Sequence, residues 1–228
     1  MITLAVDTSL ASISVAVVDD DAVRSELFIH TGRNHTEVLL QAIERALASA
    51  DIEKKEIDLL AVTIGPGSFT GLRVGVSTVK GLALVLRKPV IGVCTLDALA
   101  RNIMPAGDRV LICPMVDAGR DEVYVALYRS YGQNAYEKTH QECVVRPDEF
   151  VGSIRGEVIF LGGGAQKYKT LIEKTLPNRS FIAHPRFHQV RAGAVGHVGT
   201  MLFHRGGRSD IMTLVPNYLR SSYATIPD

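Results

Sequence analysis

The chain has 228 residues, of which 46% are hydrophobic and 21% are charged, and its formal net charge at pH 7 is +1. This composition is typical of a globular protein large enough for one or two domains. A net charge so close to zero excludes the global basic field that draws many proteins to nucleic-acid phosphates. The three cysteines lie far apart without a CxxC pair, so we interpret each as a small core residue in a reducing environment rather than part of a disulfide framework.

Residues 1–18 are largely apolar, which raises the question of a signal peptide. They lack a basic start, and Asp7 interrupts the run, so we reject that interpretation. No window reaches the roughly 18 uninterrupted apolar residues of a membrane helix. We therefore expect a cytoplasmic protein with no membrane partner.

The first half of the chain opens with three predicted strands and continues as an alternation of helices and strands. Short β-branched and apolar runs are separated by turns rich in aspartate, and a later segment has apolar residues at helical spacing. The expected strands are 2–6, 12–18, 22–30, 58–64 and 89–93, and the expected helices are 36–50, 70–86 and 95–103.

The second half repeats this plan. Asp7 ends the first strand and a second apolar strand follows it, and Asp117 has the same relation to the strand after it. Glycines end a later strand in each half, at 65–67 and 162–164. We therefore expect an internally duplicated α/β fold, with the junction at residues 102–109. The expected strands of this half are 110–116, 122–129 and 157–161, and its expected helices are 165–176 and 190–203.

Residues 61–86 are the most informative segment. An apolar strand enters the turn Gly65-Pro66-Gly67, and Ser68 or Thr70 can then cap a helix. That helix contains three glycines, and each costs about 1 kcal/mol relative to alanine. The repeated glycines therefore indicate that another backbone comes very close, either inside the fold or in a partner. They are Gly71, Gly75 and Gly81.

This segment closely resembles the GPG-S-F-T-G-L-R-x-G signature of the TsaB (YeaZ) family. The match there is highly specific, and more modest similarity extends along nearly the whole chain. One departure is Gly119, where the family more usually has arginine, although Arg120 follows. The weaker matches are residues 2–9, 89–100, 117–128, 162–168 and 216–220.

The resemblance implies an actin-like fold (ASKHA, ribonuclease H-like) with mixed sheets and flanking helices in two lobes. We expect residues 1–102 to form an N-terminal lobe that carries the Gly-Pro-Gly segment and the partner-binding helices. Residues 103–205 would form a smaller C-terminal lobe, and residues 206–228 a tail that returns to the first.

The resemblance also implies a non-catalytic scaffold or activator of TsaD in the formation of N6-threonylcarbamoyladenosine (t6A) at position 37 of ANN-decoding tRNAs. The implied partners are TsaD in a heterodimer, the ATPase TsaE and a second copy in a homodimer, with tRNA reached indirectly through the complex. No cofactor is required, and ATP or ADP at the complex interface is left open. The partner surface would be formed by Val38, Ala42, Gly71, Val74, Gly75, Thr78 and Leu82.

Two aspartate turns and one glycine loop are candidates for a nucleotide site. In the actin-like superfamily such turns hold the phosphates and metal of ATP, but that pattern favours glycine where Thr8 stands. The alternative is that both aspartates simply brace their turns and that the glycines allow tight packing. The Gly-Pro-Gly turn is not a P-loop, because no Gly-Lys-Ser/Thr follows. The candidates are Asp7, Thr8, Asp117, Gly162, Gly163 and Gly164.

No catalytic residue and no metal site are expected. In TsaD, the segment that corresponds to residues 89–93 is followed by a motif that resembles His-x-Glu-x-His, in which two histidines bind one metal ion. Here Thr95 and Leu99 stand at the two histidine positions. His184 and His188 have HxxxH spacing, which we interpret as a solvated loop because Pro185 intervenes. The missing ligand pair argues against a metallopeptidase. The remaining alternatives are a small-molecule kinase of the same superfamily and a nucleotide-binding sensor.

Overall fold

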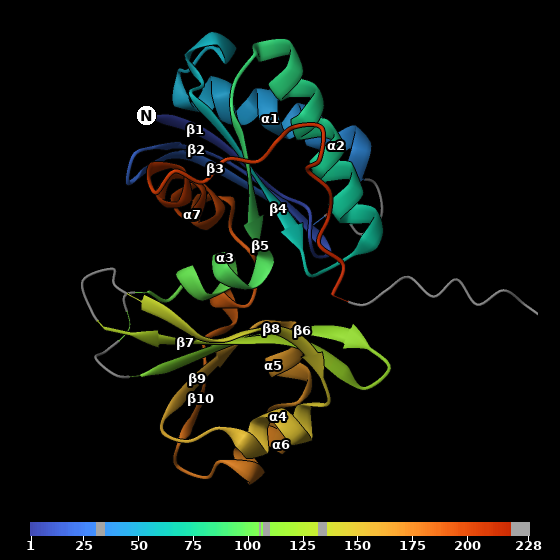
Figure 1. The fold of residues 1–228 in the computed structure, drawn as a ribbon, viewed down its shortest axis with the longest axis vertical. Helices are drawn as coiled ribbons and strands as arrows, with labels where there is room; N and C mark the ends of the chain where they lie inside the picture. The colour runs from blue at the N-terminus through green and yellow to red at the C-terminus, as the bar shows by residue number, and fades with distance from the viewer. Residues whose placement is uncertain (31–34, 105, 107–109, 132–135, 220–228) are drawn as a thin grey trace, which may run out of the picture.

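The computed structural model describes five stretches of the chain, and within them every side chain except those of residues 35–37. Two lobes lie one above the other along the long axis of the molecule, and a short helix, α3 (Thr95–Arg101), lies between them (Figure 1). The described stretches are residues 1–30, 35–104, 106, 110–131 and 136–219.

The first lobe is built on a mixed sheet with the strand order β3-β2-β1-β4-β5. The first three strands pair antiparallel, whereas β4 and β5 run parallel to β1. The predicted strands are therefore confirmed to within one residue at each end. They are β1 (Ile2–Asp7), β2 (Ser12–Asp19), β3 (Ala22–His30), β4 (Leu59–Gly65) and β5 (Val90–Cys94).

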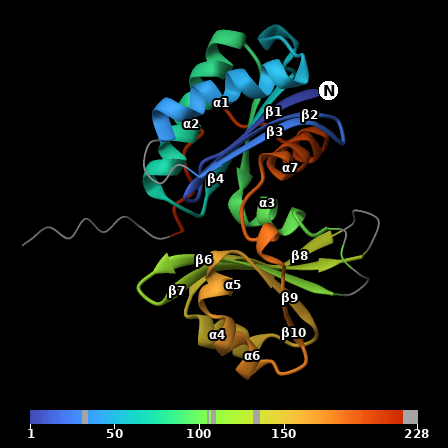
Figure 2. The same ribbon diagram turned by 180° about the vertical axis from the view of Figure 1, so that it is seen from behind.

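Helices cover both faces of this sheet because alternate strand residues point to opposite sides. Leu4 and Val6 pack with α1 (His35–Ala50) and α2 (Phe69–Leu86), whereas Ala5 packs toward α7 (Ala192–His204). Figure 2 shows the same arrangement from behind, with α1 and α2 on one side of the strands and α7 on the other. A single 3₁₀ turn, η1 (Lys54–Glu56), leads into β4.

The second lobe repeats the first. Its strands follow the order β8-β7-β6-β9-β10, with antiparallel pairs on one side of β6 and parallel pairs on the other, as around β1. This confirms the duplicated α/β fold. One face of the sheet packs on α3, and the other packs on α4 to α6. The elements are β6 (Leu111–Gly119), β7 (Glu122–Ser130), β8 (Tyr136–Val145), α4 (Pro147–Ser153), β9 (Val158–Leu161), α5 (Gly163–Lys167), α6 (Lys169–Thr175), β10 (Ser180–Ile182) and the 3₁₀ turn η2 (Pro185–Phe187).

Besides the 3₁₀ turn η2, three elements of the second lobe were not predicted: β8, α4 and β10. The strand β8 reads Tyr-Glu-Lys-Thr-His-Gln-Glu-Cys-Val-Val, so its polar residues hide the strand pattern. It is an edge strand that pairs only with β7 within the described sheet, which is where polar strands are tolerated. The helix expected at 165–176 is two helices, α5 and α6, which meet at Tyr168.

The expected boundary of the second lobe at residue 205 is wrong. α7 packs on β1, β2, β4 and β5 of the first sheet. Its glycines allow this contact, because a Cβ atom at Gly196 would lie 2.5 Å from Val18, and one at Gly199 would lie 2.7 Å from Ala61. The chain therefore returns to the first lobe already at Ala192, before the tail begins.

Residues 209–219 form a C-terminal strap along the first lobe (Figure 1). Ser209 pairs with Val90, and the backbone N–H of Asn217 donates to the carbonyl of Ile64 at 2.6 Å. The ammonium of Lys80 on α2 donates to two strap carbonyls, at 3.3 Å to Met212 and 3.1 Å to Leu214. Residue 220 and the end of the expected tail lie outside the described residues.

Among the described residues, α2 is the one helix long and apolar enough to cross a membrane by length and composition. One face of it packs on β4, and its buried residues belong to the core of the first lobe. This is the pattern of a helix that covers a sheet in a globular fold.

Candidate functional site

A cavity of about 640 Å³ lies between the two lobes, and we call it the cleft. It opens where β1 and β6 end, and the start of α2 and the glycine loop before α5 form further parts of its wall. Strand ends at a sheet edge are a common position for ligand sites in α/β folds. Its described lining is Ser9, Leu10, Ala11, Gly67, Ser68, Val116, Asp117, Ala118, Gly119, Tyr124, Gly163, His188 and Gln189.

The turn after β1 is braced from within. Asp7 is fully buried, and its Oδ1 accepts hydrogen bonds from the Ser9 hydroxyl at 2.6 Å and the Thr63 hydroxyl at 2.7 Å. The Ser9 backbone N–H donates to the same oxygen at 3.1 Å. In this structure the Asp7 carboxylate therefore ties β1 to β4 and does not line the cleft.

Thr8 lies against the first turns of α2. Its hydroxyl donates to the carbonyl of Gly71 at 2.7 Å. A Cβ atom at Gly71 would lie 2.1 Å from the Thr8 carbonyl oxygen, and one at Gly75 would lie 2.2 Å from Thr8 Oγ1. The close approach predicted from these glycines thus occurs inside the fold. Ser68 is the N-cap, and its hydroxyl accepts from the N–H of Gly71.

Asp117 stands on the opposite wall of the cleft, at the end of β6. Its carboxylate accepts from the N–H of Gly119 at 3.1 Å and forms an ion pair with Lys167 at 3.0 Å. The hydrogen bond from Lys167 to Asp117 raises the pKa of the ammonium. Both side chains are about two-fifths exposed, so this pair is open to solvent and to a ligand.

In the glycine loop before α5, two glycines pack tightly against β6 and the glycine between them is open. Gly162 has φ +100°, and a Cβ atom there would lie 2.3 Å from the carbonyl oxygen of Met115. Gly164 is similarly packed on Met115, with 2.7 Å to its Cγ, whereas nothing lies within 4 Å of a Cβ atom at Gly163. Only the middle glycine therefore faces the cleft.

His188 was missed by the interpretation of residues 184–188 as a solvated loop. The side chain is buried and lines the cleft, and its Nδ1 accepts from the N–H of Gly162 at 2.8 Å. Burial lowers the pKa of His188 below 6.5, which keeps the ring neutral and able to accept this hydrogen bond. The HxxxH spacing contained no signal for this contact, because Gly162 is distant in sequence.

The helix α3 presents no metal-binding pair at the two positions compared with TsaD. Thr95 and Leu99 are both buried, and Leu99 packs against the glycine loop, 2.9 Å from where a Cβ of Gly162 would stand. Among the described residues, no group of three or more histidine, cysteine, aspartate or glutamate side chains could hold a metal ion.

The surroundings of the three cysteines make their thiols poor nucleophiles. Burial raises the pKa of all three thiols, to about 12 for Cys94, and Cys113 is fully enclosed. A thiol with a raised pKa holds little of the reactive thiolate at neutral pH.

The structure thus divides the six candidate nucleotide residues. Asp117 and Gly163 line the cleft, whereas Asp7, Thr8, Gly162 and Gly164 support its walls from behind. Ser9, Gly67 and Ser68 also line the cleft, although the sequence did not single them out for this role.

The predicted partner surface also requires correction. Ala42, Gly71 and Gly75 are buried inside the first lobe, so they cannot contact a partner in this fold. The other four residues of that set, Val38, Val74, Thr78 and Leu82, are partly exposed.

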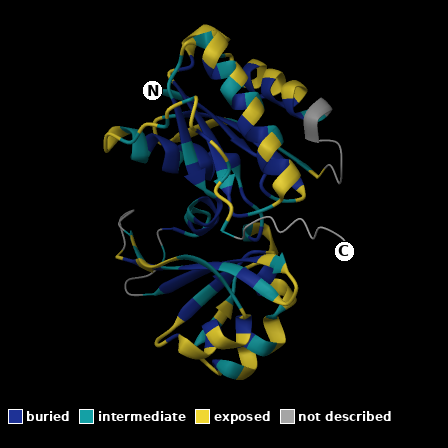
Figure 3. Cartoon of the chain, turned by 45° about the vertical axis from the view of Figure 1, so that its right-hand side comes forward, coloured by how far each residue is buried: buried dark blue, intermediate teal, exposed yellow. Residues whose placement is uncertain are grey.

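The most exposed apolar residues of the two helices were not in the predicted set. Val85 is 81% exposed and Leu84 60% exposed, and Gly81 has open space around it. Leu40 on the neighbouring α1 is also exposed. Figure 3 shows the outward face of α2 as a row of exposed residues. We call Leu40, Gly81, Leu84 and Val85, with Val38, Val74, Thr78 and Leu82, the outer face of α1 and α2.

Comparison with known proteins identifies the family. A family model described as "TsaD: tRNA N6-adenosine threonylcarbamoyltransferase" matches residues 29–227. The tRNA threonylcarbamoyladenosine biosynthesis protein TsaB of Bacillus subtilis is 30% identical over 227 residues, which are 98% of this chain and 96% of that protein. The protein of the same name from Escherichia coli K12 is 32% identical over 171 residues, 74% of each chain.

Solved structures agree with this match. YeaZ from Pseudomonas aeruginosa superposes with a TM-score of 0.81 at 25% identity, over 96% of this chain and 99% of that one. The ROK hexokinase from Thermus thermophilus superposes with a TM-score of 0.53 at 14% identity, over 91% and 100%, which shows a shared actin-like fold and nothing further. From its sequence, its duplicated fold and its relatives, the chain belongs to the TsaB (YeaZ) family.

Proposed function

We propose that this chain is a non-catalytic subunit of a tRNA threonylcarbamoyltransferase complex, and that it acts as a scaffold and activator of TsaD in t6A formation at position 37 of ANN-decoding tRNAs. The observation that carries the proposal is the nearly full-length match to the Bacillus subtilis protein that is named for tRNA threonylcarbamoyladenosine biosynthesis. The Escherichia coli protein of the same name matches over 74% of each chain. We place the chain in the cytoplasm, where it reaches tRNA through the complex.

The chemistry of the site supports a catalytically silent role. Among the described residues that line the cleft, Asp117 is the one carboxylate, and it is paired with Lys167. At the positions compared with the TsaD metal motif stand a buried threonine and a buried leucine, and leucine has no atom that binds a metal. The thiol groups are held in their unreactive form. Transfer of the threonylcarbamoyl group then belongs to TsaD.

The outer face of α1 and α2 is the surface that we assign to TsaD. Exposed Leu84 and Val85 would be buried by a partner, and the missing side chain at Gly81 lets another helix approach closely. A partner of the same fold would present the same helix pair, so one surface would serve a TsaD heterodimer and a homodimer in competition. TsaE would join the pair that this chain forms with TsaD.

A nucleotide-binding role is the second candidate, and the cleft is the observation that favours it. Its volume of about 640 Å³ lies within the range of small-molecule sites, and Gly163 leaves its backbone accessible there. We propose ATP or ADP as the ligand, bound by the chain alone or only at its joint with TsaD. A small-molecule kinase would need in addition a carboxylate free to act as a base beside the substrate.

A reconstituted modification assay tests the proposal. Purified TsaD, TsaE, a TsaC-type synthase for the threonylcarbamoyl-AMP donor, ATP and an ANN-decoding tRNA are combined with and without this chain, and t6A is measured by mass spectrometry of nucleosides. We expect t6A only when the chain is present, and no turnover of ATP or donor by the chain alone. Equal t6A without the chain would overturn the scaffold role, and ATP turnover by the isolated chain would favour the kinase.

A further inference from the structure

The chain crosses between the lobes at two places, and contacts hold each crossing on both sides. In the first, α3 follows β5 directly, and the chain then continues into β6 of the second lobe. In the second, the chain leaves η2 and enters α7 on the first sheet. In a two-lobed protein that closes on a ligand, such crossings act as hinges.

The first crossing lies inside a continuous hydrophobic core. Leu96 and Leu99 of α3 are fully buried in a cluster that joins residues of both lobes. The cluster includes Ala61 and Val93 of the first sheet and Leu161 of the second. Because packed cores resist continuous deformation, the lobes cannot slide past α3 without creating voids.

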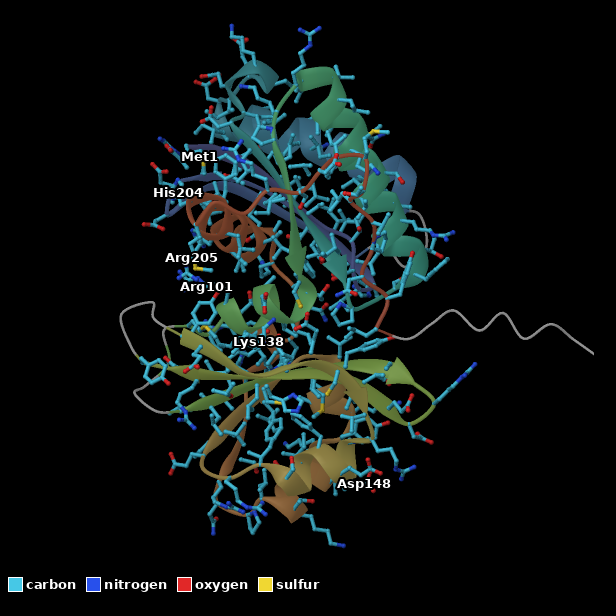
Figure 4. The ribbon with its side chains drawn as sticks, in the orientation of Figure 1. Met1, Arg101, Lys138, Asp148, His204 and Arg205 are labelled. Atoms are coloured by element: carbon cyan, nitrogen blue, oxygen red, sulfur yellow. The ribbon has the colours of Figure 1, made fainter. Side chains whose placement is uncertain are left out.

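A polar cluster also ties α3 to the second sheet. Asp97 accepts a hydrogen bond from the hydroxyl of Tyr128 on β7 and forms an ion pair with Lys138 on β8 at 2.7 Å. Lys138 also pairs with Glu142 at 2.9 Å. Figure 4 places Lys138 between the lobes, below α3. Burial alone would lower the pKa of Lys138, but the Asp97 carboxylate outweighs it and raises that pKa, so the ammonium stays charged.

The second crossing is held by hydrogen bonds on both sides. The side-chain amide of Asn102, at the end of α3, donates to the carbonyls of Gln189 at 2.7 Å and Phe187 at 3.3 Å. Arg191 then pairs with Glu26 of β3 through two nitrogens, at 2.7 and 3.1 Å. The segment between the lobes is thus attached to α3 and to the first sheet.

We propose that Asp97, Tyr128 and Lys138, together with the core around α3, lock the two lobes at one separation, so that the cleft does not close on a ligand. Rotation of the lobes about α3 would separate the half-buried Asp97 carboxylate from Lys138 and leave that carboxylate poorly solvated without its cation. It would also open the shared core. A cleft of constant width suits a protein that presents a surface to a partner rather than one that encloses a substrate.

Pulsed electron paramagnetic resonance between spin labels on the two lobes tests the lock. We would introduce cysteines at Ala48 on α1 and Lys174 on α6, which are exposed and belong to different lobes. The raised pKa values of the native thiols favour labelling of the introduced ones. The labelled chain without further substitutions, the parent chain of this experiment, should give one narrow distance distribution that MgATP does not shift. This result does not depend on a role of the chain in t6A formation.

The lock is then broken by the double variant Tyr128→Phe, Lys138→Met, for which we expect a broader distribution with a second population. Lys138→Arg keeps the charge and should keep the narrow distribution. Lys169→Met removes an exposed pair with Glu173 within α6 and is the matched control. A broad or MgATP-sensitive distribution in the parent chain would overturn the proposal, and so would a double variant as narrow as the parent. If the double variant does not fold, the parent distribution with and without MgATP decides.

Discussion

Gly75 lies directly beneath the side chain of Thr8, so that a Cβ atom added to Gly75 would stand 2.2 Å from Thr8 Oγ1. The same hydroxyl donates to the carbonyl of Gly71, one turn earlier on α2. The first half of α2 therefore needs glycine for contact within its own lobe. Gly81, in the second half, has open space around it and is available to a partner.

This difference predicts that one glycine-to-valine variant is destabilised and that another is not. Gly75→Val forces the helix away from the turn after β1 and should lower the free energy of unfolding by about 1–3 kcal/mol, the usual cost of overpacking. Gly81→Val adds a side chain in open space and should change that free energy by less than about 0.5 kcal/mol. Urea unfolding of the two variants and the parent chain measures both. Equal destabilisation would contradict the packing described for Thr8.

The outer face of α1 and α2 predicts a loss of TsaD binding on introduction of a charge. Val85→Glu places a carboxylate at the most exposed apolar position of α2 and should weaken TsaD binding by at least about tenfold, because a charge buried at an interface without a partner is costly. The stability of the chain alone should not change. Isothermal titration calorimetry with TsaD gives the affinity.

Phe181→Glu is the matched control for this variant. Phe181 is an exposed apolar residue on β10 of the second lobe, outside the outer face of α1 and α2. It should leave TsaD binding unchanged. If both variants bound TsaD as the parent chain does, the assignment of the surface would be wrong, although the role in t6A formation could still stand.

We expect Lys80 to stabilise the C-terminal strap locally. Lys80→Met removes a charged donor from the carbonyls of Met212 and Leu214. Since the donor is partly exposed, we discount its contribution to about 1 kcal/mol, which corresponds to roughly fivefold faster amide exchange in residues 209–219. Hydrogen-exchange mass spectrometry measures this, with Lys88→Met as control. Unchanged exchange in the strap would show that Leu214 and Asn217 hold it without Lys80.

We expect His188 to make the stability of the folded chain depend on pH in the mildly acidic range. Burial lowers the pKa of His188 in the folded chain below 6.5, the ordinary value that we take for the unfolded chain. At any pH between the lowered pKa and 6.5, the unfolded chain therefore binds more protons than the folded chain. Stability should therefore fall as the pH falls from about 6.5 through the lowered pKa. Protonation would also place an N–H opposite the N–H of Gly162 and remove that hydrogen bond.

The comparison of His188→Gln with the parent chain isolates this effect. Glutamine has an acceptor for the N–H of Gly162 but does not titrate, so urea unfolding of the variant should depend less on pH between about pH 7 and 5. An identical pH dependence in both proteins would assign the effect to other groups.

Local patterns predicted the core elements of both lobes correctly. The short apolar run of β2 is a buried strand, and the residues at helical spacing in α1 pack in the core of the first lobe. Of the two suggested caps of α2, Ser68 and Thr70, the structure uses Ser68. The edge strand β8 was missed because its polar residues are not required to face a core. His188 was missed because its partner, Gly162, approaches only when the two segments fold together.

Residue types close together along the chain were enough to predict the five strands of the first lobe, the duplicated plan and, through residues 61–86, the family. Three further features became clear from the packing of the folded chain: which glycines of α2 face inward, that α7 belongs to the first lobe, and which side chains reach the cleft. Those outcomes depend on contacts between segments far apart in sequence, such as Thr8 with Gly75 and Val18 with Gly196. The sequence does not show whether a glycine allows a close contact within its own lobe or with a partner, and the packing distinguishes the two.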